Sequence, residues 1–316
     1  MGRPSIGLAL GGGGARGWAH IGVLRTLSRA GIEPDIISGT SVGALVGGVH
    51  LAGKLDQLED WARGLSKLRI VSYLDLQVGG GMIGGHRLSA TMREHLGAVR
   101  IEELPLPFTC VATDLLTGHE VWLRKGDLVD MLRASMSLPG LFSPLEVEGR
   151  WLVDGALVNP VPVSVCQALG AQMTIAVNLN GDLIGKSRRS SLLQALGQIE
   201  TDRAREEEPT ASGKIRRAFT RGSRRRERDR PNLFNVMIST VNIVQDRITR
   251  SRLAGEPPDV HIMPRLGHIG LIEFDRTEEI IAEGEAAVER MMPELREALS
   301  VLRVDAQPAP PPDGLD

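Results

Sequence analysis

The chain has 316 residues and a formal net charge of −2, and 42% of its residues are hydrophobic but only 3% aromatic. Its length fits one large α/β domain or two small ones, and the near-neutral charge excludes a protein that is basic throughout and binds nucleic acid over its whole surface. The two cysteines, Cys110 and Cys166, stand in apolar segments without the spacing of a metal site. Buried, reduced thiols at these positions indicate a reducing cytoplasm, and no metal or other cofactor is expected. No apolar run reaches the roughly 18 residues needed to cross a bilayer, so we expect a soluble protein.

Short apolar runs alternate with amphipathic segments along most of the chain. The runs predict strands at Ile6–Leu10, Asp35–Ser38, Phe108–Ala112, His119–Leu123, Met173–Asn178 and Val260–Met263, and a hairpin within Leu145–Val153. Helical spacing predicts helices at Arg16–Ala30, Val42–Gly53, Leu55–Leu65, His86–Leu96, Leu128–Met136, Val161–Leu169, Val236–Ile248 and Thr277–Leu302, the last interrupted or kinked near Pro293. Strands that alternate with helices are typical of a mainly parallel sheet with helices on both faces, so we expect an α/β fold.

Residues 181–231 differ in composition from the rest of the chain. Of these 51 residues 22 are charged, so we expect a mobile insertion in a single domain that spans residues 1–303. Within it, Lys214–Arg230 has nine basic and two acidic residues, an excess suited to anionic lipid headgroups. Because Phe219 is the one aromatic residue there, we do not expect contact with nucleic acid. The Pro-rich residues 304–316 are expected to be a disordered tail.

A G-x-S-x-G pattern at residues 39–43 follows a predicted strand and precedes a predicted helix. In this context it predicts a nucleophile elbow, a sharp turn that exposes the hydroxyl of Ser41 at the end of the sheet. Gly39 and Gly43 leave room for the tight backbone, and the helix N-terminus favours negative charge at the oxygen. A serine that only caps a buried helix would give the same local sequence, so both interpretations stay open.

A glycine run between the first predicted strand and helix, residues 11–17, is the second motif. Three of its glycines match G-x-G-x-x-G, but a dinucleotide site also requires an acidic residue at the end of the second strand, where Ile37-Ser38-Gly39 stands. In the other interpretation, which we favour, amide groups of this loop form an oxyanion hole beside Ser41. Arg16 would then add positive charge near the oxyanion, or it would lie in solvent at the start of the helix.

An activated serine needs a base, and the seven histidines lie in no distinctive motif. His261 and His268 come late enough in the chain to complete a triad in the Ser–Asp–His order of α/β-hydrolases. Asp154 is the better candidate, because it ends an apolar run and Gly155 permits an abrupt turn after it. Asp114, at the end of another predicted strand, is its main competitor.

These motifs, in this order, resemble those of the patatin-like phospholipases, most closely the bacterial proteins related to neuropathy target esterase. They are the glycine run with Arg16, the pattern around Ser41, and Asp154-Gly155-Ala156 after Leu138-Pro139-Gly140. The resemblance extends broadly over residues 6–178 and returns at residues 252–259. It implies a three-layer α/β/α domain with a mainly parallel central sheet. It also implies a serine acyl hydrolase that cleaves carboxylic esters of phospholipids or lysophospholipids through an acyl-enzyme intermediate.

The resemblance further implies which residues act. Ser41 would be the nucleophile and Asp154 the general base of a Ser–Asp dyad without histidine. The oxyanion hole would come from Gly12, Gly13 and Gly14, with Arg16, Gly39, Gly43 and Gly155 in support. The role of Lys214–Arg230 does not come from the resemblance: its basic excess favours contact with an anionic membrane, on the inner face, and a solvated loop that binds nothing is the other interpretation. The alternative is a non-catalytic lipid- or nucleotide-binding α/β module that this segment recruits to a membrane or to a partner.

Overall fold

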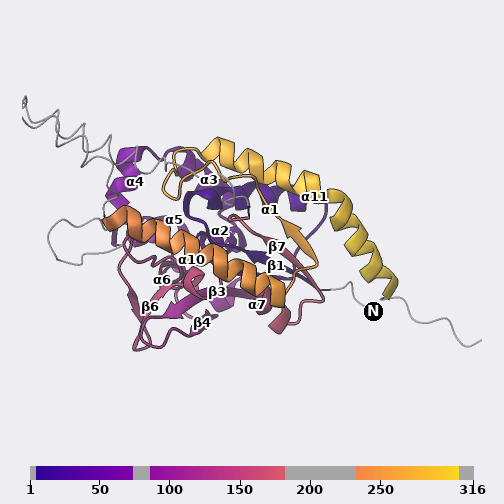
Figure 1. Cartoon of the computed structure of the whole chain (residues 1–316), viewed down its shortest axis with the longest axis horizontal. Coiled ribbons are helices and arrows are strands. Elements are labelled where there is room, and N and C mark those ends of the chain that lie inside the picture. Colours follow the sequence, from indigo (N-terminus) through magenta and orange to yellow (C-terminus); the bar gives the residue numbers. More distant parts are fainter. Residues whose placement is uncertain (1–4, 74–85, 182–232, 306–316) are drawn as a thin grey trace, which may run out of the picture.

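The computed structural model describes residues 5–73, 86–181 and 233–305 (Figure 1). Its core is an eight-stranded sheet in the order β5-β6-β3-β2-β1-β7-β8, with β4 paired to β3. The strands from β3 to β8 along this order are parallel, whereas β4, β5 and β6 pair antiparallel. Their bounds are β1 Ile6–Leu10, β2 Ile36–Thr40, β3 Phe108–Asp114, β4 Glu120–Leu123, β5 Leu145–Val147, β6 Arg150–Asp154, β7 Met173–Val177 and β8 Val260–Ile262.

Helices cover both faces of this sheet. The α-helices are α1 Ala19–Arg29, α2 Val42–Leu51, α3 Leu55–Arg63, α4 Lys67–Tyr73, α5 His86–Leu96, α6 Leu128–Ser135, α7 Val163–Ala168, α10 Leu233–Gly255 and α11 Thr277–Asp305. Short 3-10 helices are η1 Gly14–Trp18, η2 Ile101–Glu103 and η3 Gly155–Leu157. In Figure 1, α1 and α11 lie on one side of β1 and β7, α7 lies on the other, and α10 crosses in front.

Side chains of the central strand β1 alternate between the two helical layers, as the pleat requires. Leu8 and Leu10 belong to the large core that α1, α2, α6 and α11 share. Ala9 belongs to a smaller cluster with Val163 and Cys166 of α7. The expected α/β fold, with a mainly parallel sheet between helical layers, is therefore confirmed.

The expected elements are present among the described residues, with ends that shift. The first helix starts later than predicted, because η1 occupies its first turn after Gly14, whose φ of 57° only glycine adopts readily. α4 was not predicted, because its seven residues are too few for a clear periodicity. α11 continues through Pro293 and bends along its length (Figure 1).

Two predicted regions lie outside the described residues. The charged insertion of residues 181–231, with Lys214–Arg230, falls outside them from residue 182 onward, and the Pro-rich tail does so from residue 306. Within the part of the chain that the structure describes, we find no helix with both the length and the apolar character that a membrane crossing requires.

Candidate active site

Ser41 stands at a sharp turn between β2 and α2. Its φ of 56° and ψ of −126° are unusual for a residue with a side chain, and such backbone costs about 1–3 kcal/mol. The turn needs both flanking glycines, because a Cβ on Gly39 would lie 2.5 Å from the Cα of Ala44 and one on Gly43 would overlap the carbonyl oxygen of Leu10. The Ser41 side chain makes no capping bond to α2. The simple helix-cap interpretation is therefore wrong, and the turn has the geometry expected of a nucleophile elbow.

Two strands bring Ser41 and Asp154 together by meeting end to end along one edge of β3. β2 runs parallel to β3 and its last residue, Thr40, pairs with Val111. β6 runs antiparallel, and its last residue, Asp154, pairs with the next residue, Ala112. Because β4 occupies the other edge of β3 at both positions, β2 and β6 must share this edge. The Ser41 hydroxyl consequently donates to Oδ2 of Asp154 at 2.6 Å.

The Asp154 carboxylate is almost fully buried, at 1% exposure. Burial raises its pKa to about 6, although hydrogen bonds from the Ser41 hydroxyl and the Ala156 backbone oppose the rise. The Ala156 N–H holds Oδ1 at 2.8 Å, which leaves Oδ2 for the serine. Gly155 is required beside it, since a Cβ there would overlap the carbonyl oxygen of Val111. A carboxylate whose pKa lies nearer to neutrality is better suited to accept a proton from serine.

The competing candidates lie elsewhere. The Asp114 carboxylate accepts hydrogen bonds from two backbone N–H groups of the turn that follows it, which lower its pKa. His268 bonds the Glu279 side chain, and His261 lies on β8. None of the three lines the cavity at Ser41. The structure thus groups Asp154, and not these residues, with the serine.

The glycine loop before η1 borders the same cavity. Gly12 donates its backbone N–H to the carbonyl of Pro160 at 2.9 Å, so this amide has an acceptor already. The amides of Gly13 and Gly14 have no acceptor among the described residues, and both glycines line the cavity with Ser41 and Asp154. Of the three glycines predicted to supply oxyanion donors, Gly13 and Gly14 therefore stay candidates, whereas Gly12 does not.

Three buried side chains hold the carbonyls of residues 11–13, one each. His20 Nε2 lies 2.7 Å from the carbonyl oxygen of Gly11. Asn180 Nδ2 lies 3.4 Å from that of Gly12, and Arg16 Nε lies 3.1 Å from that of Gly13. In a planar trans peptide the C=O and the following N–H point in opposite directions. Because Asn180 binds the Gly12 carbonyl, the N–H of Gly13 points away from Asn180. In the same way, the N–H of Gly14 points away from Arg16.

Arg16 and His20 are both buried, at 1% and 0% exposure. Burial lowers the pKa of Arg16 to about 10, and the interpretation of Arg16 as a solvent-exposed residue is wrong. Within the described ranges no carboxylate pairs with it, and one of its terminal nitrogens has no acceptor. Burial lowers the pKa of His20 to about 4, so the ring is neutral at pH 7. Its Nε2 must bear the hydrogen, because a carbonyl only accepts.

Three residues at this site, His20, Asn180 and Ser135, were not predicted from the sequence. The Ser135 hydroxyl donates to the carbonyl of Val111 at 2.6 Å and accepts the N–H of Ser41 at 2.9 Å. Asn180 follows β7, and a polar residue shortly after an apolar strand is the one sequence signal that could have identified it. His20 and Ser135 lie on the buried faces of helices, where a polar residue interrupts the apolar pattern.

The cavity at Ser41 is lined almost wholly by apolar side chains. Apart from Ser41, Asp154 and the loop glycines, its lining includes Trp18, Trp61, Met136, Leu138, Phe142 and Leu271, with Gln245 of α10 as a polar exception. Such a lining excludes water and fits a hydrocarbon group.

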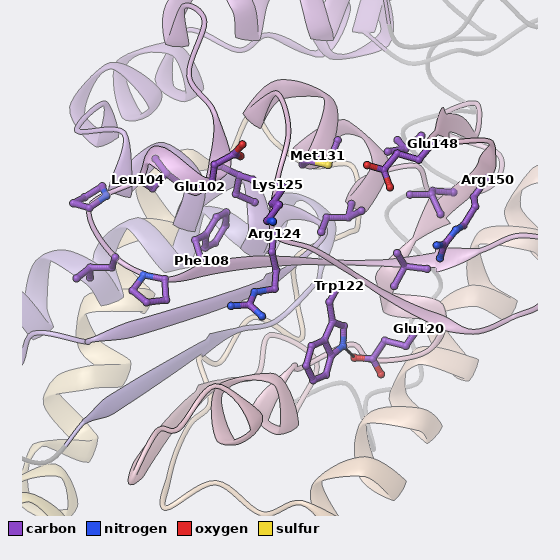
Figure 2. A pocket seen from close by; sticks show the side chains of 18 residues that line it. Glu102, Leu104, Phe108, Glu120, Trp122, Arg124, Lys125, Met131, Glu148 and Arg150 are labelled. Carbon is purple, nitrogen blue, oxygen red and sulfur yellow. Dashed lines mark hydrogen bonds between the residues drawn. The ribbon is translucent and has the colours of Figure 1, made fainter.

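A larger cavity, about 840 Å³ against about 80 Å³, lies away from the serine (Figure 2). Charged side chains of both signs line it, among them Glu120, Arg124 and Arg150, and the Trp122 indole donates to Glu120 at 2.7 Å. Although it is the larger of the two, its lining includes neither Ser41 nor Asp154, so it has no part in the chemistry of the dyad. Nowhere in residues 5–73, 86–181 and 233–305 do three or more His, Cys, Asp or Glu side chains gather to hold a metal.

Comparisons with known proteins identify a family that this chain resembles over most of its length. A family model described as patatin-like phospholipase matches residues 8–166. An uncharacterized NTE family protein of Mycobacterium tuberculosis is 36% identical over 323 residues, which cover 90% of each chain. The lysophospholipase NTE1 of Mycosarcoma maydis is 36% identical over 190 residues, 55% of this chain and 10% of that protein. The neuropathy target esterase sws of Drosophila melanogaster is 36% identical over 183 residues, 55% of this chain and 13% of that protein.

Proposed function

This chain belongs to the patatin-like phospholipase family, and from that premise we propose that it is a serine hydrolase that cleaves carboxylic esters of phospholipids or lysophospholipids. The observation that supports this most strongly is the 2.6 Å hydrogen bond from the Ser41 hydroxyl to Asp154 inside an apolar cavity. Relatives named as lysophospholipase and esterase favour a lipid ester as substrate.

In the proposed reaction, Ser41 Oγ attacks the ester carbonyl while Asp154 Oδ2 takes the hydroxyl proton. The negative charge that develops on the carbonyl oxygen meets the N–H groups of Gly13 and Gly14, and the buried guanidinium of Arg16 adds positive charge beside that loop. When the tetrahedral intermediate collapses, the C–O bond to the leaving alcohol breaks and the alcohol takes the proton from Asp154. An acyl-Ser41 ester remains.

Water completes the cycle by the same route. Asp154 takes a proton from a water molecule as its oxygen attacks the acyl carbonyl, and the collapse returns the proton to Ser41 Oγ. The products are a free fatty acid and the regenerated serine. No histidine is needed, because burial already raises the pKa of Asp154 to about 6 and the serine donates to it directly.

A non-catalytic lipid- or nucleotide-binding module remains the second candidate. The strained backbone of Ser41 and the buried carboxylate beside it both cost stability, and a binding module has no use for either. The hydrolase is therefore the better proposal.

The basic segment Lys214–Arg230 would bring the enzyme to the inner, cytoplasmic face of an anionic membrane. Salt-sensitive binding to anionic but not neutral vesicles would test this.

The direct test is covalent labelling with a long-chain fluorophosphonate, followed by intact mass and peptide mapping. We expect one adduct, on Ser41, which is absent from Ser41→Ala and much slower to form in Asp154→Asn. Ser66→Ala, at an exposed serine after α3, is the matched control and should label like the wild type. A folded protein that stays unlabelled, or undiminished ester hydrolysis by purified Ser41→Ala, would refute the proposal.

A further inference from the structure

Gln245 of α10 is a buried polar residue that the proposed reaction does not use. Its side chain lines the cavity that contains Ser41 and Asp154, and only 4% of the residue is exposed. α10 packs on η3, the turn directly after Asp154 (Figure 1). Among the described residues, the side-chain amide of Gln245 has no hydrogen-bond partner. A buried amide without a partner destabilises a fold, which suggests that a ligand pairs with it.

The neighbours of Gln245 on the helix hold it in this position. One turn earlier, Val241 packs against the apolar cluster that includes Leu138 and Leu271. One turn later, Thr249 is also buried, but its hydroxyl donates to the backbone carbonyl of Gln245 at 2.7 Å. Residues four apart share one face of a helix, so Val241, Gln245 and Thr249 all face the protein. The hydroxyl of Thr249 is thus paired within the helix, whereas the amide of Gln245 is not.

α10 turns this polar side chain inward and apolar side chains outward. Ile243 lies roughly 200° around the helix from Gln245 and Val244 roughly 100°. Ile243 is 63% exposed and Val244 is 41% exposed. A surface helix ordinarily has the reverse arrangement, with its apolar side toward the core. Burial of apolar surface therefore does not explain why Gln245 faces the cavity, whereas a polar partner inside the cavity does.

The chemistry of the proposed substrate limits what this partner can be. A fatty acyl chain has no polar atom beyond its carbonyl, and in the proposed reaction that oxygen meets Gly13 and Gly14. The partner of Gln245 must therefore belong to the alcohol part of the ester. A phosphate in that part is charged, and no cationic side chain of the described residues lines the cavity, so its burial beside Gln245 would be costly.

A free hydroxyl of the alcohol fits better than a second ester. An amide offers both N–H donors and an oxygen acceptor, and a hydroxyl can use both, whereas an ester carbonyl only accepts. A second ester also brings a second hydrocarbon chain, for which a cavity of about 80 Å³ has little room. The Tyr73 hydroxyl in the same lining already has a partner in Thr91, so Gln245 is the better candidate to bind the substrate hydroxyl.

We propose that Gln245 is a specificity-determining residue, whose amide binds a free hydroxyl on the carbon next to the esterified carbon of the substrate alcohol. The inference rests on the proposed function and specifies its substrates as partial esters, in which the neighbouring hydroxyl is free. A site that pairs a buried polar group with a substrate hydroxyl discriminates against the analogue without it, because the group in the protein is then left unpaired.

Three soluble esters test this preference in the wild type. They are hexanoyl lysophosphatidylcholine, its analogue without the free hydroxyl, and dihexanoyl phosphatidylcholine, in which the same oxygen carries a second chain. We expect kcat/KM for the first to exceed that for the second on the order of ten- to a hundredfold. The third should be poorer than the first by about tenfold or more. Equal values of kcat/KM for the three esters would overturn the proposal.

Gln245→Met tests the residue itself, because methionine removes the amide but has a similar shape and a similar helix propensity. The preference for the free hydroxyl should fall to within about twofold, since the amide and the hydroxyl form the two sides of a double-mutant cycle. The rate for the analogue should rise, because the wild type must leave its amide unpaired when the analogue binds. A merely structural role would lower both rates and preserve their ratio, which would overturn the proposal. Gln167→Met makes the same change at an exposed position on α7 and should keep the wild-type ratio.

The outcomes separate this inference from the proposed function. If the folded wild type hydrolyses none of the three esters, the proposed function fails. Calorimetry with Ser41→Ala then tests Gln245 alone, since hexanoyl lysophosphatidylcholine should bind on the order of tenfold more tightly than the analogue without the hydroxyl. Equal binding of the two would overturn the role of Gln245. Neither this comparison nor that in the wild type changes Gln245, so both decide the proposal even if Gln245→Met does not fold.

Discussion

The hydroxyl of Ser135 holds the backbone of Ser41. It accepts the Ser41 N–H at 2.9 Å and donates to the carbonyl of Val111 at 2.6 Å, so one fully buried side chain fastens the strained turn to β3. Val111 is also the residue that pairs with the end of β2. The nucleophile is thus tied to the same strand that positions the end of β6 and its carboxylate.

Removing this hydroxyl should loosen the nucleophile. In Ser135→Ala the partly buried N–H of Ser41 loses its acceptor, which costs at most about 1–3 kcal/mol of stability. We expect kcat to fall at least tenfold with little change in KM, since the dyad geometry and not the cavity is affected. Ser135→Thr keeps the hydroxyl and should recover most of the rate. An Ser135→Ala enzyme with wild-type kcat would show that β2 alone holds the turn.

Activity should depend on the protonation of Asp154. The carboxylate must be deprotonated to accept the serine proton, and burial raises its pKa to about 6. We therefore expect kcat/KM to increase tenfold per pH unit below about pH 6 and to level off above it. The test is a pH profile measured with an uncharged short-chain ester. A profile that is flat down to pH 4 would contradict a general base with this pKa.

The same raised pKa predicts a trend in stability. Between the usual pKa near 4 and the folded value near 6, the folded state binds a proton that the unfolded state releases, so the free energy of unfolding falls as pH rises through this range. The full effect is about 1–3 kcal/mol. Asp154→Asn should remove this contribution, and the difference in free energy between wild type and variant should thus change with pH. Denaturant unfolding at pH 4.5 and 7.5 measures it.

Much of the fold followed from the sequence, for an identifiable reason. The strands of the parallel sheet are buried on both faces and appear as continuous apolar runs, as in Ile6–Leu10, which match the observed strands closely. Motif spacing then singled out Ser41 and Asp154, because each stands where an apolar run ends. α4 was missed, since seven residues are too few for a period to be read.

The rest depended on tertiary pairing. No local pattern says that β2 and β6 share an edge of β3, yet that arrangement brings the serine and the carboxylate to 2.6 Å. Likewise, Gly12, Gly13 and Gly14 look equivalent in sequence. The three glycines differ in whether their N–H already has a hydrogen-bond acceptor. The acceptor of the Gly12 N–H is the carbonyl of Pro160, which lies far along the chain.

This difference among the glycines can be tested by alanine substitution. Gly14 has a φ of 57°, and a Cβ there would overlap the carbonyl oxygen of Leu271, so Gly14→Ala should misplace a proposed oxyanion donor. Losing one such donor costs on the order of 10²–10³ in kcat. Gly12→Ala is the comparison, because its Cβ would meet only atoms at 3.3 Å or more and its amide is already engaged. Equal losses of kcat in the two folded variants would argue against Gly14 as a donor.

Arg16 offers a way to separate function from stability. It is a buried cation without a carboxylate partner among the described residues, and such a charge usually destabilises a fold. Arg16→Met removes the charge and the bond to the Gly13 carbonyl. We expect kcat to fall on the order of a hundredfold while stability stays within about 1 kcal/mol, because the relief of an unpaired charge offsets the lost hydrogen bond.

Arg16→Lys is the matched variant, since it keeps the charge but not the planar donor group. If the positive charge is what stabilises the oxyanion, the kcat of Arg16→Lys should lie between those of Arg16→Met and the wild type. Affinity for a trifluoromethyl ketone, which forms an oxyanion on Ser41, should follow kcat across the series, whereas affinity for the uncleaved ester should not. A variant that loses stability and kcat together, with both affinities unchanged, would assign Arg16 to the fold and not to the reaction.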